Sequence, residues 1–547
     1  MSQHIRLLPA CFSIVAALTL SACDNSSRMS SSTPGQLPEP KLENVVVVSN
    51  EITTNLEGPI PPQCYTKTEG QHNPCYTCHQ VYDRTENAYR QNLLDDGGLQ
   101  GDYMFSDVGE TNHWKNLFVD RTQWIDSVSD ATIDAYISQD NYSQLTERLA
   151  QTGWQGFTPD LDNFADSAAA FDEQGFAKDG SYWIAFNYKP FPGTFWPTNG
   201  STDDVIIRLP KEFRERQGNV DRNMYFLNLS LLEMSIKDLP EISIPKTNET
   251  ALDVDLNGDG QLSENVSTMI KRSYYLGDAS EIAVIEQQYP LGTEFMHSVR
   301  YVGSNIQGDI FIPKRMKELR YMKKIRTMSK QEFRNRYARE RKEKFLGEIP
   351  NYVNLGDRGI DNGMGWLVQG FIEDQEGALR PQSYEENLFC MGCHAAIGTT
   401  VDQTFAFGRK VTGESGWGYI NLKGMPDAKN LNEEGGEILN YLKRNGGGNE
   451  FRENDEMLAR WYNEDHTVNE EAVKQADVYE LLKPSRERAL KLNKAYTHIV
   501  RHQSFIYGRD ATWTPALNVY TDIDQSIAPL GQKFRFYGWD IRLDWSH

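Results

Sequence analysis

The sequence predicts an α+β fold in which two helical, loop-rich regions flank a mixed α+β middle. Two short cysteine motifs lie 315 residues apart, towards the two ends of the chain. The apolar runs between them are short and irregularly spaced, which is typical of strands and buried helices in a mixed domain. A formal net charge of −21 argues against nucleic acid as a partner, and seven cysteines in 547 residues are too few for a disulfide scaffold.

The N-terminal segment has the layout of a secretory signal. A polar start with one cation precedes a mostly apolar stretch from Leu7 to Leu20, too short and wrongly flanked for a spanning helix. The tetrapeptide that ends at Cys23 resembles a bacterial lipobox, in which the cysteine is diacylated. We therefore expect Cys23 to anchor the protein at the periplasmic side of a bacterial membrane. Asp24 resembles the signal that retains enterobacterial lipoproteins at the inner membrane; an ordinary signal peptide cleaved nearby is the alternative.

Composition and motifs divide the chain into five segments. Residues 25–42 are rich in Ser and Pro and contain almost nothing to bury, so they read as a tether. The predicted order is a signal peptide (1–22), the tether (23–42), a first motif region (43–150), an α+β middle (151–310) and a second motif region that begins with a basic helix (311–547).

Both motifs have the pattern C-x-x-C-H, the attachment signature of c-type haem. Two thiols three residues apart on a helical turn can reach the two vinyl groups of one porphyrin, and the next residue presents an imidazole to the iron. The spacing therefore predicts two covalently attached haems. The thioether cysteines and proximal histidines are Cys75, Cys78 and His79 in the first motif and Cys390, Cys393 and His394 in the second.

Two other interpretations of the cysteines compete with haem. Paired C-x-x-C units can form a four-cysteine zinc site, and a single unit can be a redox-active dithiol. Neither requires a histidine directly after both pairs. With the four motif cysteines assigned, Cys64 has no disulfide partner. It is either a small buried hydrophobic residue or a thiolate near the first haem.

The second axial ligand of each iron decides between electron transfer and peroxide or oxygen chemistry. His113 follows the first motif by 34 residues and has aromatic neighbours, and His297 has apolar residues on both sides. We expect His113 at the first haem and His297 at the second. Met425, in a Gly-x-Met-Pro-like loop, is the rival ligand for the second haem.

A calcium loop is predicted in the middle region. Oxygen-bearing side chains alternate there around glycines, as a hard cation requires, but position 12 of the EF-hand register is Val266 instead of glutamate. An Asx-rich turn without a metal is the alternative. The candidate ligands are Asp255, Asn257, Asp259, Gln261 and Glu264.

Several elements follow from periodicity. Residues 314–344 hold 14 Lys and Arg against four Glu, with apolar residues at roughly helical spacing, and predict one or two amphipathic helices. Short apolar runs predict strands at residues 204–209 and 282–285 and either a helix or a buried strand at residues 224–232. A further helix is predicted at residues 486–505.

The paired motifs behind a lipoprotein leader resemble the di-haem c-type cytochromes of proteobacterial periplasms. Within that group the bacterial di-haem peroxidases are similar in binding calcium, although their two motifs lie closer together, and the di-haem rubber oxygenases are similar in size. This resemblance implies helical, cytochrome c-like haem regions around the middle region.

Two main functions compete on this basis. The first is a membrane-tethered di-haem protein that passes single electrons between its haems and a periplasmic or membrane redox partner. The alternative is a peroxidase- or oxygenase-like oxidoreductase with one open-faced haem. Oxidation of a small sulfur anion at a haem bound by Cys64 is a third hypothesis.

Overall fold

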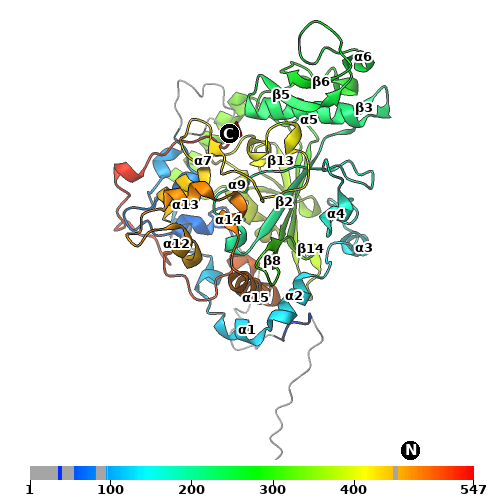
Figure 1. Ribbon diagram of the computed structural model, residues 1–547. Helices are drawn as coiled ribbons and strands as arrows, with labels where there is room; N and C mark the ends of the chain where they lie inside the picture. Colours follow the sequence, from blue (N-terminus) through cyan, green and yellow to red (C-terminus); the bar gives the residue numbers. More distant parts are fainter. Residues whose placement is uncertain (1–34, 40–54, 82–93, 95, 447–453, 547) are drawn as a thin grey trace, which may run out of the picture.

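One antiparallel sheet forms the centre of the computed structural model, which describes residues 35–39, 55–81, 94, 96–446 and 454–546 (Figure 1). Its eight strands run in the order β1-β2-β7-β10-β13-β12-β11, with β14 paired to β13. The α+β class is therefore confirmed. The strands of this sheet are β1 (Ile184–Ala185), β2 (Thr202–Arg208), β7 (Glu294–Arg300), β10 (Met316–Lys324), β11 (Val353–Asn354), β12 (Ile360–Asp361), β13 (Trp366–Glu373) and β14 (Leu379–Pro381).

Both faces of the sheet are covered at its centre, so the strands β7, β10 and β13 bury most of both alternating sets of side chains. One face packs on the segment of helices α3 and α4, through residues such as Ile206, Met296 and Leu319. The other face points towards the two cysteine motifs. The sheet includes strands from either side of residue 310, where the sequence suggested a boundary.

The strand β10 corrects the prediction that residues 314–344 are wholly helical. Its residues pair with β7 on one side and β13 on the other, and only Lys330–Phe345 forms a helix, α7. Several charged residues of β10 form ion pairs inside the protein instead of facing solvent: Arg320 Nε lies 3.0 Å from Glu318 Oε2, and Lys324 pairs with Asp402. A strand in the middle of a covered sheet can thus have a polar sequence when each charge has a partner.

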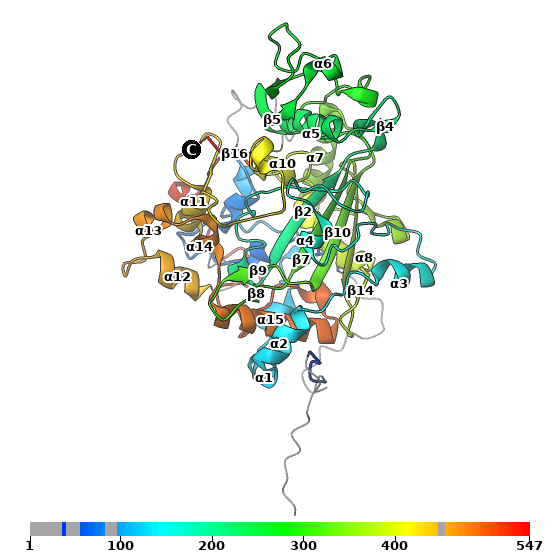
Figure 2. The same ribbon diagram turned by 45° about the vertical axis from the view of Figure 1, so that its right-hand side comes forward.

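Short helices and loops surround the sheet, with α15 packed against α1 and α2 below it and α11–α14 on the side of the motifs (Figures 1 and 2). The described residues contain no helix both long and apolar enough to cross a bilayer. The helices are α1 (Thr122–Ser127), α2 (Asp130–Ile137), α3 (Leu145–Gln151), α4 (Ser167–Ala170), α5 (Arg222–Lys237), α6 (Glu249–Leu252), α7 (Lys330–Phe345), α8 (Tyr384–Asn387), α9 (Met391–His394), α10 (Ala406–Arg409), α11 (Glu437–Asn445), α12 (Asp455–Trp461), α13 (Glu470–Gln475), α14 (Val478–Leu482) and α15 (Arg486–His502).

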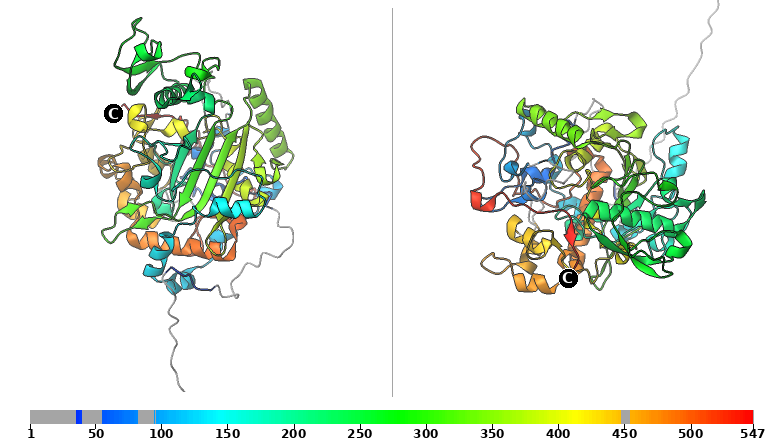
Figure 3. Two further views of the ribbon diagram at one scale, coloured as in Figure 1. Left: turned by 90° about the vertical axis from the view of Figure 1, so that its right-hand side faces the viewer. Right: turned by 90° about the horizontal axis from the view of Figure 1, so that it is seen from above.

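An excursion between β2 and β7 projects beyond one end of the sheet (Figure 3, left). Residues 224–232, for which helix and strand remained open, belong to α5. Asp221 caps its N-terminus by accepting from the N–H of Met224, and nearly every side chain of the helix is buried. Residues 282–285 form no strand, contrary to the prediction; Ala283 makes one isolated bridge. The remaining short strands are β3 (Glu215–Arg216), β4 (Asn219–Val220), β5 (Glu241–Thr247), β6 (Val266–Ile270), β8 (Gly303–Ser304), β9 (Ile310–Phe311), β15 (Lys429–Asn430) and β16 (Leu543–Asp544).

The helix predicted over residues 486–505 is confirmed as α15, and it carries an acid-sensitive pair of imidazoles. The rings of His498 and His502 lie 4.1 Å apart, with Trp124 edge-on to His498. Burial, together with His502 and the Arg121 guanidinium, lowers the pKa of His498 to about 3. The unfolded chain, with a pKa near 6.5, therefore binds a proton that the native state rejects between pH 6.5 and 3.

We expect the free energy of unfolding to fall as the pH drops through this window, and H498L to flatten that fall. Urea unfolding at pH 7 and pH 4.5 measures the difference. The variant H466N is the control, because His466 is exposed and its positive φ of 64° is tolerated by asparagine. An equal pH dependence in H498L and the parent chain would contradict the assignment to His498.

Candidate functional site

Each motif lies in a short helical turn. In the first, the 3₁₀ turn Pro74–Thr77 directs the N–H groups of Cys78 and His79 at the carbonyl of Cys75, at 3.2 and 3.0 Å. In the second, the 3₁₀ turn Leu388–Cys390 runs directly into α9. Both turns thus place two thiols on one helical turn and a histidine directly after the second.

The two motif histidines are oriented in the same way by different acceptors. His79 Nδ1 lies 3.0 Å from Asp96 Oδ2, and His394 Nδ1 lies 2.8 Å from the carbonyl oxygen of Gln403. Because a carbonyl or carboxylate oxygen accepts, Nδ1 carries the proton and Nε2 keeps the lone pair that can bind a metal. Burial lowers the pKa of His394 to about 4, which keeps this imidazole neutral at neutral pH.

The fold brings the two motifs side by side, which the sequence left open. Thr399, five residues after the second motif, donates its hydroxyl at 2.8 Å to the carbonyls of Thr77 and Cys78. Cys393 contributes to the raised pKa of Cys78, which places the two side chains near each other. Segments separated by more than 300 residues therefore form one site.

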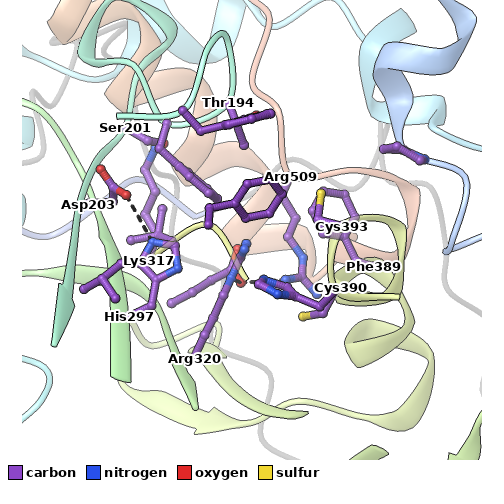
Figure 4. A pocket seen from close by; sticks show the side chains of 18 of the residues that line it. Thr194, Ser201, Asp203, His297, Lys317, Arg320, Phe389, Cys390, Cys393 and Arg509 are labelled. Carbon is purple, nitrogen blue, oxygen red and sulfur yellow. Dashed lines mark hydrogen bonds and ion pairs between the residues drawn. The ribbon is translucent and has the colours of Figure 1, made fainter. Parts of the chain in front are cut away.

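A mostly apolar cavity opens between the second motif and the sheet (Figure 4). The sheet contributes alternate residues of β2, β7 and β10 together with Val368 of β13, and the facing wall carries the second motif and aromatic rings. His297 lies in register with Arg320 on β10 and Val205 on β2. The principal lining residues are Asp203, Val205, Phe295, His297, Val299, Glu318, Arg320 and Met322 from the sheet, and Phe389, Cys390, Cys393, His394 and Phe405 opposite.

The sheet wall of this cavity carries a cluster of polar groups. His297 Nε2 lies 3.4 Å from Asp203 Oδ2 and is buried without a hydrogen bond. Glu318 lies between Arg320 and Arg509, with Arg509 Nη1 2.6 Å from Glu318 Oε2. Burial alone would raise the pKa of Glu318, but the two guanidinium groups hold it at about 2. This carboxylate therefore stays ionised and fixes both arginines.

The predicted residues near the motifs are only partly brought together. His297 lines the cavity with the second motif, as expected of its distal ligand. Met425 does not line it; this residue is buried in the main core, where its carbonyl accepts from the N–H of Val478. His113 lies at the half-exposed edge of the first motif region, with Nε2 3.2 Å from the carbonyl of Val108 and 3.3 Å from Glu57.

Burial raises the pKa of the four motif thiols and of Cys64, to about 12 for Cys64 and about 11 for Cys393. Protonated thiols are poor metal ligands. In the described part of the chain, no group of three or more His, Cys, Asp or Glu side chains is arranged to hold a metal ion. The four motif thiols are accordingly not gathered into a zinc-type site.

The predicted calcium loop is held together by its own hydrogen bonds. Asp255 accepts from the N–H groups of Gly258 and Gly260, and Asp259 accepts from Gln261. The buried Glu249, which the sequence analysis missed, accepts from the N–H groups of Leu256 and Asn257 and of Ser263. Glu264 is exposed. Calcium binding by this loop stays a prediction.

Sequence reasoning missed three further residues of the site. Asp96 and Thr399 hold the first motif, and Arg320 lies on the cavity wall. Only Arg320 could have been found, because it alternates with Glu318 and Met322 in a segment that also fits a strand.

The fold and the site define an α+β protein with two thiol-and-histidine motifs on one face of a covered sheet. A family model described as "-like lipoprotein" matches residues 48–479. The chain is also 34% identical over 522 residues to an "Uncharacterized lipoprotein" of Aquifex aeolicus (strain VF5), covering 83% of this chain and 86% of the relative. No solved structure matches. The chain therefore belongs to this lipoprotein family.

The resemblance to the di-haem c-type cytochromes of proteobacterial periplasms is wrong as a family assignment. The family that matches residues 48–479 is a lipoprotein family, and neither match is to a cytochrome c family. The resemblance was carried by two five-residue motifs and the leader, whereas the matches extend over most of the chain. Membership of a lipoprotein family supports lipid attachment to a membrane; Cys23 itself lies outside the described residues.

Proposed function

We propose that the protein binds one haem covalently at each motif and passes single electrons between the two sites and a redox partner. The observation that carries the proposal is the adjacency of the two motifs, joined through Thr399 to the carbonyls of Thr77 and Cys78. A haem cycles between its ferric and ferrous states and so supplies one-electron chemistry when bound. Two such groups held side by side have a short path for the electron.

The cavity at the second motif fits a covalently attached haem. Its walls are mostly apolar and aromatic, as a porphyrin requires, and it presents two thiols followed by a neutral imidazole. On the opposite wall, the buried Nε2 of His297 has no hydrogen bond. Cys390 and Cys393 would hold the group and His394 would bind its iron, with His297 as the candidate ligand on the other side.

The first motif has the same order of donors. Cys75 and Cys78 would hold the group and His79 would bind the iron. Attachment through thioethers makes retention independent of affinity, which suits a protein outside the cytoplasm. We propose that lipid on Cys23 keeps the body at the periplasmic side of the membrane, with residues 23–42 as the tether; Asp24 favours the inner membrane.

A second candidate function is favoured by the polar cluster opposite the second motif. Asp203, His297 and Arg320 lie on three neighbouring strands and face one cavity. A histidine close to a carboxylate can hold and move a proton, and an arginine on the next strand stabilises developing negative charge. If His297 does not bind the iron, this wall suits peroxide or dioxygen chemistry at an open-faced haem.

The test is to count haems and measure their spin states in the holoprotein. The chain, without its lipid anchor, is produced in a host that attaches c-type haem, and pyridine haemochromogen spectra should give two haems per chain. Low-temperature EPR should show two low-spin ferric signals. A high-spin signal that shifts with cyanide or peroxide would favour the second candidate, and a chain without haem would overturn both.

Removal of His297 separates the two candidates further. If His297 binds iron, H297A is expected to convert one low-spin EPR signal to high spin, because the second face loses its ligand. H466N is the control and should leave both signals unchanged, because His466 is exposed and does not line the cavity. Two unchanged signals in H297A would show that another group binds the second haem.

A further inference from the structure

The acceptors of the two motif histidines differ in charge. His79 donates to the carboxylate of Asp96, whereas His394 donates to the neutral backbone carbonyl of Gln403, at 3.0 and 2.8 Å. Hydrogen bonds to a charged acceptor are roughly twice as strong as those between neutral groups. The two imidazoles are therefore unequal donors, even though both keep Nε2 for a metal.

Three donors fix the carboxylate of Asp96 in this position. Oδ1 accepts from the N–H of Gln80 at 2.7 Å, and Oδ2 accepts from His79 and from the N–H of Gly398 at 3.2 Å. The Asp96 side chain is only 8% exposed. A carboxylate held by three donors does not swing away from the imidazole.

Gly398 lets the segment after the second motif approach this carboxylate. A Cβ atom at position 398 would lie 2.4 Å from Asp96 Oδ1, so any larger residue displaces the carboxylate. Gly398 comes four residues after His394. The segment of one motif thus positions the carboxylate that acts on the histidine of the other.

A carboxylate acceptor raises the basicity of a metal-bound imidazole, and hydrogen bonding behind the ligand is one of the levers that set a redox potential. A more basic ligand stabilises the ferric over the ferrous charge and so lowers the potential. Resting on the proposed function, we infer that Asp96 makes the site at His79 the lower-potential, electron-donating site of the pair, and the site at His394 the acceptor.

This assignment gives electron transfer inside the protein a direction, from the site at His79 to the site at His394. One electron leaves the site at His79, which is oxidised from ferrous to ferric, and enters the site at His394, which is reduced from ferric to ferrous. No bond forms or breaks and no proton is required. The partner that reduces the protein would therefore meet the first site, and the partner that oxidises it would meet the second.

The experiment is a spectroelectrochemical titration of the holoprotein and of D96N. The parent chain should show two one-electron waves, and the single-haem variant C390S/C393S identifies the wave of the first site. In D96N we expect the midpoint potential of the lower wave to rise by about 59 mV or more. For a one-electron couple, this corresponds to at least a tenfold increase in the equilibrium constant for reduction. The upper wave should stay in place.

D102N is the matched control for a general charge effect. Asp102 is close enough to Cys75 to affect it electrostatically and pairs with Arg535 at 3.6 Å, whereas the Nδ1 of His79 is bound by Asp96. D102N should shift the lower wave by much less than D96N. Equal shifts in the two variants, an unmoved lower wave in D96N, or a parent chain whose lower wave belongs to His394 would each overturn the inference.

A second variant keeps the inference testable if D96N does not assemble. G398A leaves every charge in place and displaces the carboxylate, so it should raise the same wave in the same direction. A normal haem count with no shift in G398A would also overturn the inference. A chain that binds no haem would instead overturn the proposed function, so the two failures are distinguishable.

Discussion

Serine in place of both Cys390 and Cys393 is expected to halve the haem content of the protein. Serine cannot form the thioether bonds, so the second group would be retained by His394 and cavity contacts alone. Pyridine haemochromogen spectra should fall from two haems per chain to one. The remaining haem should keep the EPR signal of the site at His79, because the first motif is untouched.

The matched control is C64S, which replaces a half-buried cysteine beside both motifs. Burial raises the pKa of Cys64 to about 12, so this thiol is protonated at neutral pH and makes a poor iron ligand. C64S should therefore keep two haems. Loss of one haem in C64S would revive the hypothesis that Cys64 is a ligand, and two haems in the double serine variant would contradict covalent attachment at the second motif.

The local geometry of the motifs could be predicted from the sequence because it depends on consecutive residues. Five consecutive residues place two thiols and an imidazole on one helical turn, and no distant contact is needed to see it. His297 could also be singled out, from its apolar neighbours at 296 and 299. The structure places it on the wall facing the second motif because β7 directs every second residue into the cavity.

The long-range features could not be predicted. The adjacency of the motifs depends on Thr399 and Gly398, which carry no signal in the sequence until the chain is folded. The strand β10 was missed because Glu318 and Arg320 are typical of a solvated surface, although the two form an ion pair and Glu318 is buried. Asp96 resembles any other loop aspartate.

Loss of the negative charge at Glu437 is expected to destabilise the protein by about 3–5 kcal/mol, the usual cost of leaving a buried charge without its partner. Both carboxylate oxygens bind the Arg409 guanidinium, at 2.7 and 2.6 Å, and Lys189 lies 3.1 Å away. All three residues are at least 98% buried. E437Q keeps the shape but leaves Arg409, which lines the cavity, without a carboxylate.

In the parent chain, low pH should remove the stabilisation that the ionised Glu437 contributes. Burial alone would raise the pKa of Glu437, but Arg409 and Lys189 hold it at about 2, below its usual value of 4.5. The stabilisation is therefore present above pH 4.5 and lost as the pH falls towards 2. Urea unfolding of the holoprotein, followed by circular dichroism, should show the loss in E437Q at pH 7 and a weaker acid dependence.

The control E470Q separates burial from charge pairing. Lys443 and Lys474 also lower the pKa of Glu470 to about 2, but this side chain is exposed on α13. Solvent screens an exposed pair, so E470Q should leave the unfolding midpoint unchanged. Similar losses in the two variants would contradict a role for burial. A loss confined to E437Q would show that the ion pairs behind the cavity hold its wall together, because Arg409 joins the cavity to α11 through Glu437.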